Sequence, residues 1–305
     1  MKSFSNTRAS TLQATRSPSS SAHSSPRRRH RARVVNGHRG SAHFALAVFF
    51  ALFVCFLYGP TITIATLSFQ GPDGGLTFPT NGASVHWFAN LFQQQAVGDF
   101  GGSFTRSILL ATMIKCLTVV IALLAGLTFR RRFRFSNALF YLIVASLIVP
   151  SILVSLGIGL MFNVIGVQPT WWGSALGAHL TWTLPFGVLI MFAVFNRFDR
   201  SLEEAARDLG ATPWQSFRHV VLPLIAPSLV GVALFGFTLS YDEFARSLMA
   251  AGSDNTLPLE IYGMTTNVTT PVLYALGTLT TIFSFAVIVL CGAIAVALQR
   301  RAVRT

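Results

Sequence analysis

The chain has 305 residues, of which 52% are hydrophobic and only 11% are charged. A soluble domain usually carries about a quarter charged residues, so this composition excludes an ordinary soluble globular protein. The net charge of +13 is high enough for a nucleic-acid-binding protein, but that class is excluded because the basic residues flank apolar segments. The three cysteines, Cys55, Cys116 and Cys291, lie inside apolar runs without metal-ligand spacing.

Residues 1–40 are rich in Ser and Arg and contain no acidic residue. They show no apolar periodicity, which predicts a disordered basic tail. The apolar stretch that follows is too long for a secretory signal. We favour a solvated tail that binds anionic lipid headgroups over an organellar transit peptide, which has a similar composition.

Six apolar segments follow the tail, and each is long enough to cross a bilayer as a helix at about 1.5 Å per residue. The loop after the first segment contains the aromatic sequence HWFANLF at 86–92, which predicts a short helix at the membrane interface. The pattern therefore predicts an all-α polytopic membrane protein with six transmembrane helices. The segments lie near 43–67, 104–128, 137–162, 174–195, 224–249 and 273–298.

The basic residues alternate between the two sides of these segments. The N-terminal tail, the loops 130–134 and 196–223 and the C-terminal tail hold 20 of the 23 Lys and Arg residues, and the intervening loops hold none. By the positive-inside rule, both termini are predicted to be cytoplasmic. The predicted organisation is a cytoplasmic tail (1–40), a transmembrane domain (41–299) with the cytoplasmic loop 196–223, and a short cytoplasmic C-tail (300–305).

The cytoplasmic loop between the fourth and fifth segments predicts two short helices joined at a glycine. Ser201 and Glu204 fit a capping box for the first helix, and Thr212 and Gln215 fit one for the second. Gly210 falls where a left-handed residue ends a helix. The apolar positions of the first helix share one face: Leu202, Ala205, Ala206 and Leu209. This small face predicts either packing under the helix's own bundle or close docking of a partner.

Nine residues of this loop follow a recognisable pattern. They are Glu204, Ala205, Ala206, Leu209, Gly210, Ala211, Phe217, Leu222 and Pro223. At this spacing they resemble the EAA loop of permease subunits of binding-protein-dependent ABC importers. In that family the loop forms a coupling helix that seats in a groove on the cytoplasmic ATPase subunit. The resemblance implies the same ATPase-coupling role for these residues here.

The resemblance extends over roughly residues 45–298. The segments 179–186, 239–244 and 255–261 are similar to the second permease subunit of spermidine/putrescine-type (PotC-like) importers. The chain departs from that pattern at Arg106, where the family usually has Asn before Ser. The resemblance implies a MetI-like type I importer permease fold and a small solute, such as a polyamine, as substrate. Other solutes, such as amino acid derivatives, phosphonates or iron, stay open.

Apart from Arg106 at the edge of the second segment, four charged residues fall inside the predicted spans: Lys115, Asp242, Glu243 and Arg246. Charges at bilayer depth are costly and are usually functional or paired. Either acid can meet Arg246 on a helix surface, at a spacing of three or four residues. One interpretation is a neutralised cluster that fixes helix packing or closes the outer gate. The other is that these residues line the translocation path, where two acids, Asp242 and Glu243, against the single Arg246 leave a net negative patch that suits a cation.

The chain shows no Gly-rich phosphate-binding loop with a Lys and no metal-binding cluster, so we expect no cofactor and no enzymatic activity. The resemblance implies two copies of an ATPase subunit, a second permease subunit (related or identical) and an extracytoplasmic substrate-binding protein as partners. It also implies a place in the inner (plasma) membrane, with lipid but no nucleic acid as a further contact.

Three alternatives from other classes predict different features. A stand-alone secondary transporter predicts an inverted repeat and coupling-ion carboxylates at the midplane, neither of which is evident. A membrane scaffold predicts indifference to substitution at Gly210. A membrane-embedded enzyme predicts an intramembrane catalytic cluster, which the sequence does not suggest.

Overall fold

The computed structural model describes residues 36–73, 75, 78, 80–92, 98–131, 133–267 and 271–304. The tail predicted over 1–40 lies outside the described residues as far as residue 35, and helix α1 (Asn36–Leu67) follows directly. The chain divides into two compact units, residues 1–57 and 58–305. The described part of the first unit is the N-terminal portion of α1.

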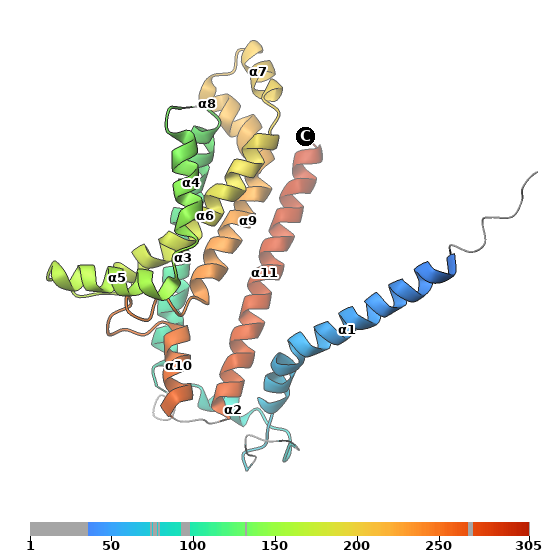
Figure 1. Ribbon diagram of the computed structural model, residues 1–305, viewed down its shortest axis with the longest axis vertical. Coiled ribbons are helices and arrows are strands. Elements are labelled where there is room, and N and C mark those ends of the chain that lie inside the picture. Colours follow the sequence, from blue (N-terminus) through green and yellow to red (C-terminus); the bar gives the residue numbers. More distant parts are fainter. Residues whose placement is uncertain are drawn as a thin grey trace, which may run out of the picture. The chain divides into compact units, whose positions relative to one another are not determined.

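The second unit holds the other helices (Figure 1). A π-helical turn, η1 (Phe217–Val221), joins α8 directly to α9. The α-helices are α2 (His86–Asn90), α3 (Phe100–Phe129), α4 (Ser136–Ser146), α5 (Ser151–Val164), α6 (Ser174–Arg197), α7 (Ser201–Asp208), α8 (Pro213–Ser216), α9 (Leu222–Tyr241), α10 (Leu257–Asn267) and α11 (Val272–Arg304).

Five helical stretches of the described chain are long and apolar enough to cross a membrane: His43–Leu67, Phe100–Phe129, Ser174–Arg197, Pro213–Tyr241 and Val272–Arg300. They match five of the six predicted spans in position. Helix α2 forms at the aromatic sequence that predicted a short helix in the first loop.

The remaining predicted span, 137–162, is not one straight helix. It is formed by α4 and α5, which meet at an angle of 99°. Pro150 immediately precedes α5 with an extended backbone, φ −58° and ψ 131°. Proline lacks an N–H and disfavours helical backbone at the residue before it. The break therefore has a local cause in the sequence, which the apolar count does not reveal.

The fifth predicted span is also corrected, because α9 ends at Tyr241 and not near Met249. The residues after Tyr241 leave the helix and form an irregular segment that packs against other helices. Ser155 Oγ accepts a hydrogen bond from the N–H of Met249 (2.9 Å), and Ser174 Oγ donates to the carbonyl of Ala250 (2.6 Å). Non-helical backbone is tolerated at membrane depth where protein groups satisfy it, and these two serines do so here.

Helix α3 packs along α6 and α9, and α9 also packs against α6 and α11 (Figure 1). Small residues allow the close approach. A Cβ added at Gly187 of α6 would lie 2.8 Å from Thr118 Cγ2 of α3. Thr118 Oγ1 also donates a buried hydrogen bond to Thr183 Oγ1 (3.0 Å). In a bilayer the hydrophobic effect does not favour helix association, because lipid tails are as apolar as the side chains. Close packing and interhelical hydrogen bonds stabilise the bundle instead.

A buried histidine ties α6 to the chain around the end of α9. The two ring nitrogens of His179 lie 2.9 Å from the hydroxyls of Ser240 and Ser247. A neutral imidazole donates with one nitrogen and accepts with the other. Both nitrogens are therefore satisfied, and His179 acts as a packing residue that secures the turn after α9.

Candidate coupling site

Helix α7 begins differently from the prediction. Ser201 is the first helical residue, and the N-cap position is Arg200, without a side-chain cap. The capping box predicted from Ser201 and Glu204 is therefore wrong. Instead, the N–H of Ser201 donates to the carboxylate of Asp199 (2.9 Å), which holds the pKa of Asp199 below its usual range. An acid just before the helix supplies the acceptor that its first N–H groups need.

The end of α7 is as predicted. Gly210 has φ of +88°, in the left-handed region that favours glycine. Its N–H donates to the carbonyl of Arg207 (2.8 Å), and the N–H of Ala211 donates to Ala206 (3.0 Å). This pair of hydrogen bonds is the Schellman motif. It turns the chain sharply from α7 into α8.

The second capping box is confirmed. Thr212 Oγ1 accepts from the N–H of Gln215 (3.3 Å), and Gln215 Oε1 accepts from the N–H of Thr212 (2.8 Å). Pro213 occupies the first turn of α8, where its missing N–H costs nothing. Since α8 runs through η1 into α9, a movement of this segment acts directly on a membrane-spanning helix.

The apolar face of α7 is exposed to solvent. Leu209 is 91% exposed, Leu202 is 45% exposed and Ala205 is also exposed, while Ala206 is half-buried. Trp214 of α8, at 64% exposed, extends this surface. Of the two interpretations of the loop, packing of this face under the helix's own bundle does not fit these exposures. The face is available to another protein.

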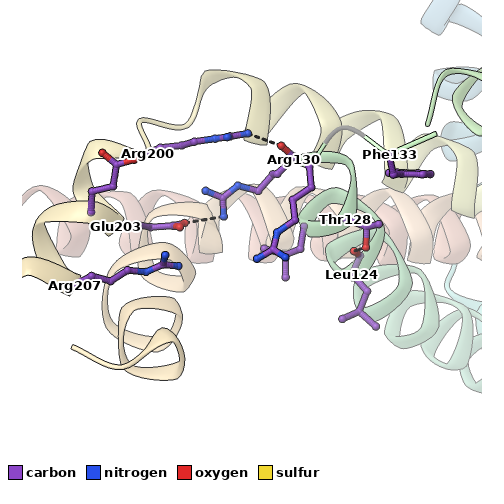
Figure 2. A pocket seen from close by; sticks show the side chains of 10 residues that line it. Leu124, Thr128, Arg130, Phe133, Arg200, Glu203 and Arg207 are labelled. Atoms are coloured by element: carbon purple, nitrogen blue, oxygen red, sulfur yellow. Dashed lines mark hydrogen bonds and ion pairs between the residues drawn. The ribbon is translucent and has the colours of Figure 1, made fainter. Parts of the chain in front are cut away.

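The opposite side of α7 is fixed to the bundle by an arginine at the end of α3. Arg130 pairs with Glu203 (2.7 Å), and both side chains are largely buried. The Arg130 guanidinium also lies over the rings of Phe195 and Phe198, 5.2 Å from each centroid. Figure 2 shows Arg200 reaching back to donate to the Arg130 carbonyl. These contacts join α7 to α3 and to the end of α6.

Sequence reasoning missed this anchor. It counted Arg130 only as a topological charge and left Glu203 outside the motif. The available signal was the adjacent acidic pair Glu203 and Glu204, in a loop that the predicted topology places on the same side of the membrane as the basic loop 130–134. Helical geometry then sends Glu203 toward α3 and leaves Glu204 exposed.

The four charged residues predicted inside the spans do not form one site. Arg246 is 1% exposed and lies in the turn after α9. Its guanidinium donates to Ser151 Oγ (2.7 Å), pairs with Glu243 (3.5 Å) and lies over the Trp182 ring at 4.6 Å. Arg246 and Glu243 thus fit the packing interpretation, because they join this turn to α5 and α6.

Asp242 and Lys115 lie apart from that pair. Asp242 is exposed and lines a cavity of about 260 Å³ beside α11, and no described residue pairs with its carboxylate. The cavity's other walls are Thr280, Thr281, Ser284, Phe285 and Ile288. Lys115 is half-buried on α3, with Nζ 5.9 Å from the Phe237 ring centroid. Asp242 thus lines an open cavity of mixed polar and apolar lining.

Arg106 replaces the Asn expected at the start of α3. Its Nε donates to the carbonyl of Asn255 (2.8 Å), and its guanidinium pairs with Asp99 (3.2 Å). The neighbouring Ser107 accepts a buried hydrogen bond from the N–H of Leu257 (2.8 Å). The departure from the family pattern is therefore accommodated by contacts between α3 and the segment before α10.

The fold consists of long apolar helices packed through small residues, with an exposed pair of short helices between two of them, as in a polytopic membrane protein. Residues 118–305 match the family described as "Binding-protein-dependent transport system inner membrane component", and the chain belongs to this family. It is a permease subunit of a binding-protein-dependent ABC importer, a transport subunit and not an enzyme. This confirms the predicted family and contradicts the secondary-transporter alternative.

Two relatives carry polyamine names. The chain is 32% identical to the spermidine/putrescine transport system permease protein PotC of Haemophilus influenzae, over 82% of this chain and 96% of that protein. It is 30% identical to the putrescine transport system permease protein PotI of Escherichia coli K12, over 73% of this chain and 81% of that protein.

A solved structure confirms the fold. A chain of a bacterial ABC transporter involved in the import of the acidic polysaccharide alginate matches with a TM-score of 0.61 and 17% identity. The match covers 85% of this chain and 96% of that chain. The all-α importer permease fold predicted from the sequence is therefore present.

The anchor of α7 can be tested by a double-mutant cycle on Arg130 and Glu203. We expect Glu203→Ala and Arg130→Ala each to lower the thermal stability of the purified transporter, because each leaves a largely buried charge unpaired. The coupling energy should be about 0.5–3 kcal/mol, the range for contacting residues. Glu204→Ala, which removes an exposed acid from the same turn, is the matched control. Additive effects of the two substitutions would show that the ion pair does not hold α7.

Proposed function

We propose that this permease transmits the motion of a cytoplasmic ATPase through the segment from α7 to η1, and that its substrate is a polyamine. The observation that carries the coupling proposal is the exposure of Leu209, Ala205 and Trp214 on a segment that is anchored on its other side. The segment from α7 to η1 is held to the bundle by Arg130 and is exposed on its other side. It can therefore receive a force from the ATPase and transmit it to α9.

The residues proposed to couple to the ATPase are those of the EAA-like pattern. Leu209 and Ala205 supply the docking face, and Gly210 and Ala211 set its angle against α8. Leu222 and Pro223 begin α9 and so receive the movement. The complete set is Glu204, Ala205, Ala206, Leu209, Gly210, Ala211, Phe217, Leu222 and Pro223.

The proposed topology places this segment in the cytoplasm. It is supported by the alternation of basic residues, since Arg130, Arg200 and Arg207 gather around the coupling segment. Both termini then lie in the cytoplasm of a cell whose inner membrane holds the six spans. The domain boundaries at 1–40, 41–299 and 300–305 belong to the same proposal.

The proposed partners follow from this arrangement. Two ATPase subunits would each receive one coupling segment, one from this chain and one from a second permease subunit. An extracytoplasmic binding protein would deliver the solute to the opposite face. The name of the family includes dependence on a binding protein, which supports that part of the proposal.

The substrate proposal rests on the named polyamine permeases and on the cavity beside Asp242. The carboxylate of Asp242 and the hydroxyls of Thr280, Thr281 and Ser284 offer acceptor oxygens toward this space. An ammonium group has only donors, so it suits such a lining. Phe285 also lines the cavity, and an aromatic ring can attract a cation. Anionic solutes, such as phosphonates, would meet repulsion at the same point.

Substitution of Gly210 tests the coupling proposal. Gly210→Asp should uncouple substrate-stimulated ATPase activity, because a side chain at φ of +88° costs about 1–2 kcal/mol and alters the turn between α7 and α8. The measurement is ATPase activity of the reconstituted transporter with and without loaded binding protein. Gly231→Ala, in α9 with open space around it, is the control. Normal stimulation in Gly210→Asp would remove this turn from the coupling path.

Neutralising Asp242 tests the substrate proposal. Asp242→Asn should lower uptake of labelled spermidine or putrescine about 10–100-fold, since a hydrogen bond to a charged group contributes about 1.5–3 kcal/mol. Asp242→Glu, which keeps the charge, should retain part of the uptake. The thermal stability of both variants should match the parent protein, because Asp242 is exposed. Wild-type uptake in Asp242→Asn would exclude this cavity from the path.

A further inference from the structure

The cavity shown in Figure 2 lies between the end of α3 and the start of α7, and it has a volume of about 730 Å³. Its polar lining contains four arginines and two glutamates: Arg130, Arg131, Arg200, Arg207, Glu203 and Glu204. Arg130 and Glu203 neutralise each other. Three arginines then face one exposed acid, and in the described chain no carboxylate pairs with Arg131 or Arg207. The cavity has an excess positive charge that the coupling role does not use.

The lining of this cavity is amphipathic. Leu124 and Leu127 form its apolar wall, and they belong to the last turns of the membrane-spanning stretch Phe100–Phe129. Arg130 and Arg131 follow immediately after that stretch. The cavity therefore lies at the basic end of this apolar stretch, where we expect hydrocarbon to give way to lipid headgroups.

A second, apolar cleft adjoins the basic cavity. It has a volume of about 570 Å³ and lies between α3, α4 and α6, with walls that include Ile121, Leu139, Ile143 and Leu184. The two spaces share Thr128 and Phe133 in their linings. Gly177 of α6 also lines the cleft, and a Cβ added there would meet nothing within 4 Å. A basic cavity at the interface thus continues into an apolar space within the span region.

We infer that these two spaces together bind an anionic phospholipid, with its phosphate against Arg131, Arg200 and Arg207 and an acyl chain in the cleft. Charge complementarity selects the headgroup, because basic pockets between membrane helices bind anionic lipids. The apolar cleft selects a lipid over free phosphate, because each buried methylene adds about 0.8 kcal/mol. The bound lipid contacts both α3 and α7, so it adds a second link between the bundle and the coupling segment.

The test uses the whole purified transporter and measures lipid binding directly by native mass spectrometry. The transporter is titrated with phosphatidylglycerol and, separately, with phosphatidylcholine of the same chain length. The double variant Arg131→Gln/Arg207→Gln should weaken phosphatidylglycerol binding about 25-fold, since each basic residue near anionic lipid contributes about fivefold in affinity. Phosphatidylcholine binding should be unchanged. Arg218→Gln removes an arginine of η1 that does not line the cavity, and it should keep full phosphatidylglycerol binding.

The variant Gly177→Leu tests whether the apolar cleft holds the acyl chain, because it fills the cleft and changes no charged residue. It should weaken binding of long-chain phosphatidylglycerol and leave the binding of a dihexanoyl analogue unaffected. Two outcomes overturn the inference. One is equal phosphatidylglycerol binding in the parent protein and the double arginine variant. The other is displacement of the lipid by inorganic phosphate with no effect of Gly177→Leu, which would make this a site for a soluble anion. Neither outcome bears on the coupling proposal, because the readout is lipid binding.

Discussion

The ion pair between Arg130 and Glu203 is the constraint on which the proposed coupling depends. α7 has only eight residues, too short to be stable alone in water, and its apolar face is exposed. The pair, at 2.7 Å, fixes the opposite face to the ends of α3 and α6. A short helix can transmit force only if it is attached on the side away from its partner. The ring faces of Phe195 and Phe198 support the Arg130 guanidinium and complete that attachment.

Rigidity beyond the anchor comes from the way α3, α6 and α9 pack. Gly187 allows α6 to approach α3 closely, and Thr118 and Thr183 hydrogen-bond across the same interface. His179 and Arg246 then tie the irregular turn after α9 to the bundle. In the proposed coupling, movement that enters at Gly210 would reach α9 through the continuous helical stretch from Pro213, and the packed bundle would carry it to the turn that holds Asp242.

Apolar length predicted most of the helices, because membrane-spanning helices must satisfy their backbone internally. The alternation of basic residues predicts which side each loop faces, and that orientation stays a prediction. Local capping and turn patterns predicted the glycine turn at Gly210 and the capping box at Thr212. These sequence patterns failed where polar contacts between residues distant in sequence determine the structure. The turn after Tyr241 is stabilised by serines distant in sequence, Ser155 and Ser174, which no local pattern reveals. The pairing of Glu203 with Arg130 was missed for the same reason.

The exposed face of α7 is the surface that we propose meets the ATPase. Site-directed cross-linking tests this most directly, with Leu209→Cys in a background where Cys55, Cys116 and Cys291 are replaced by Ser. In the assembled transporter, a short bifunctional thiol reagent should join position 209 to the ATPase subunit in a nucleotide-dependent yield. A cysteine placed at Leu156, a 41% exposed position on α5, should not form that product. Efficient cross-linking from position 156 but none from position 209 would contradict the account.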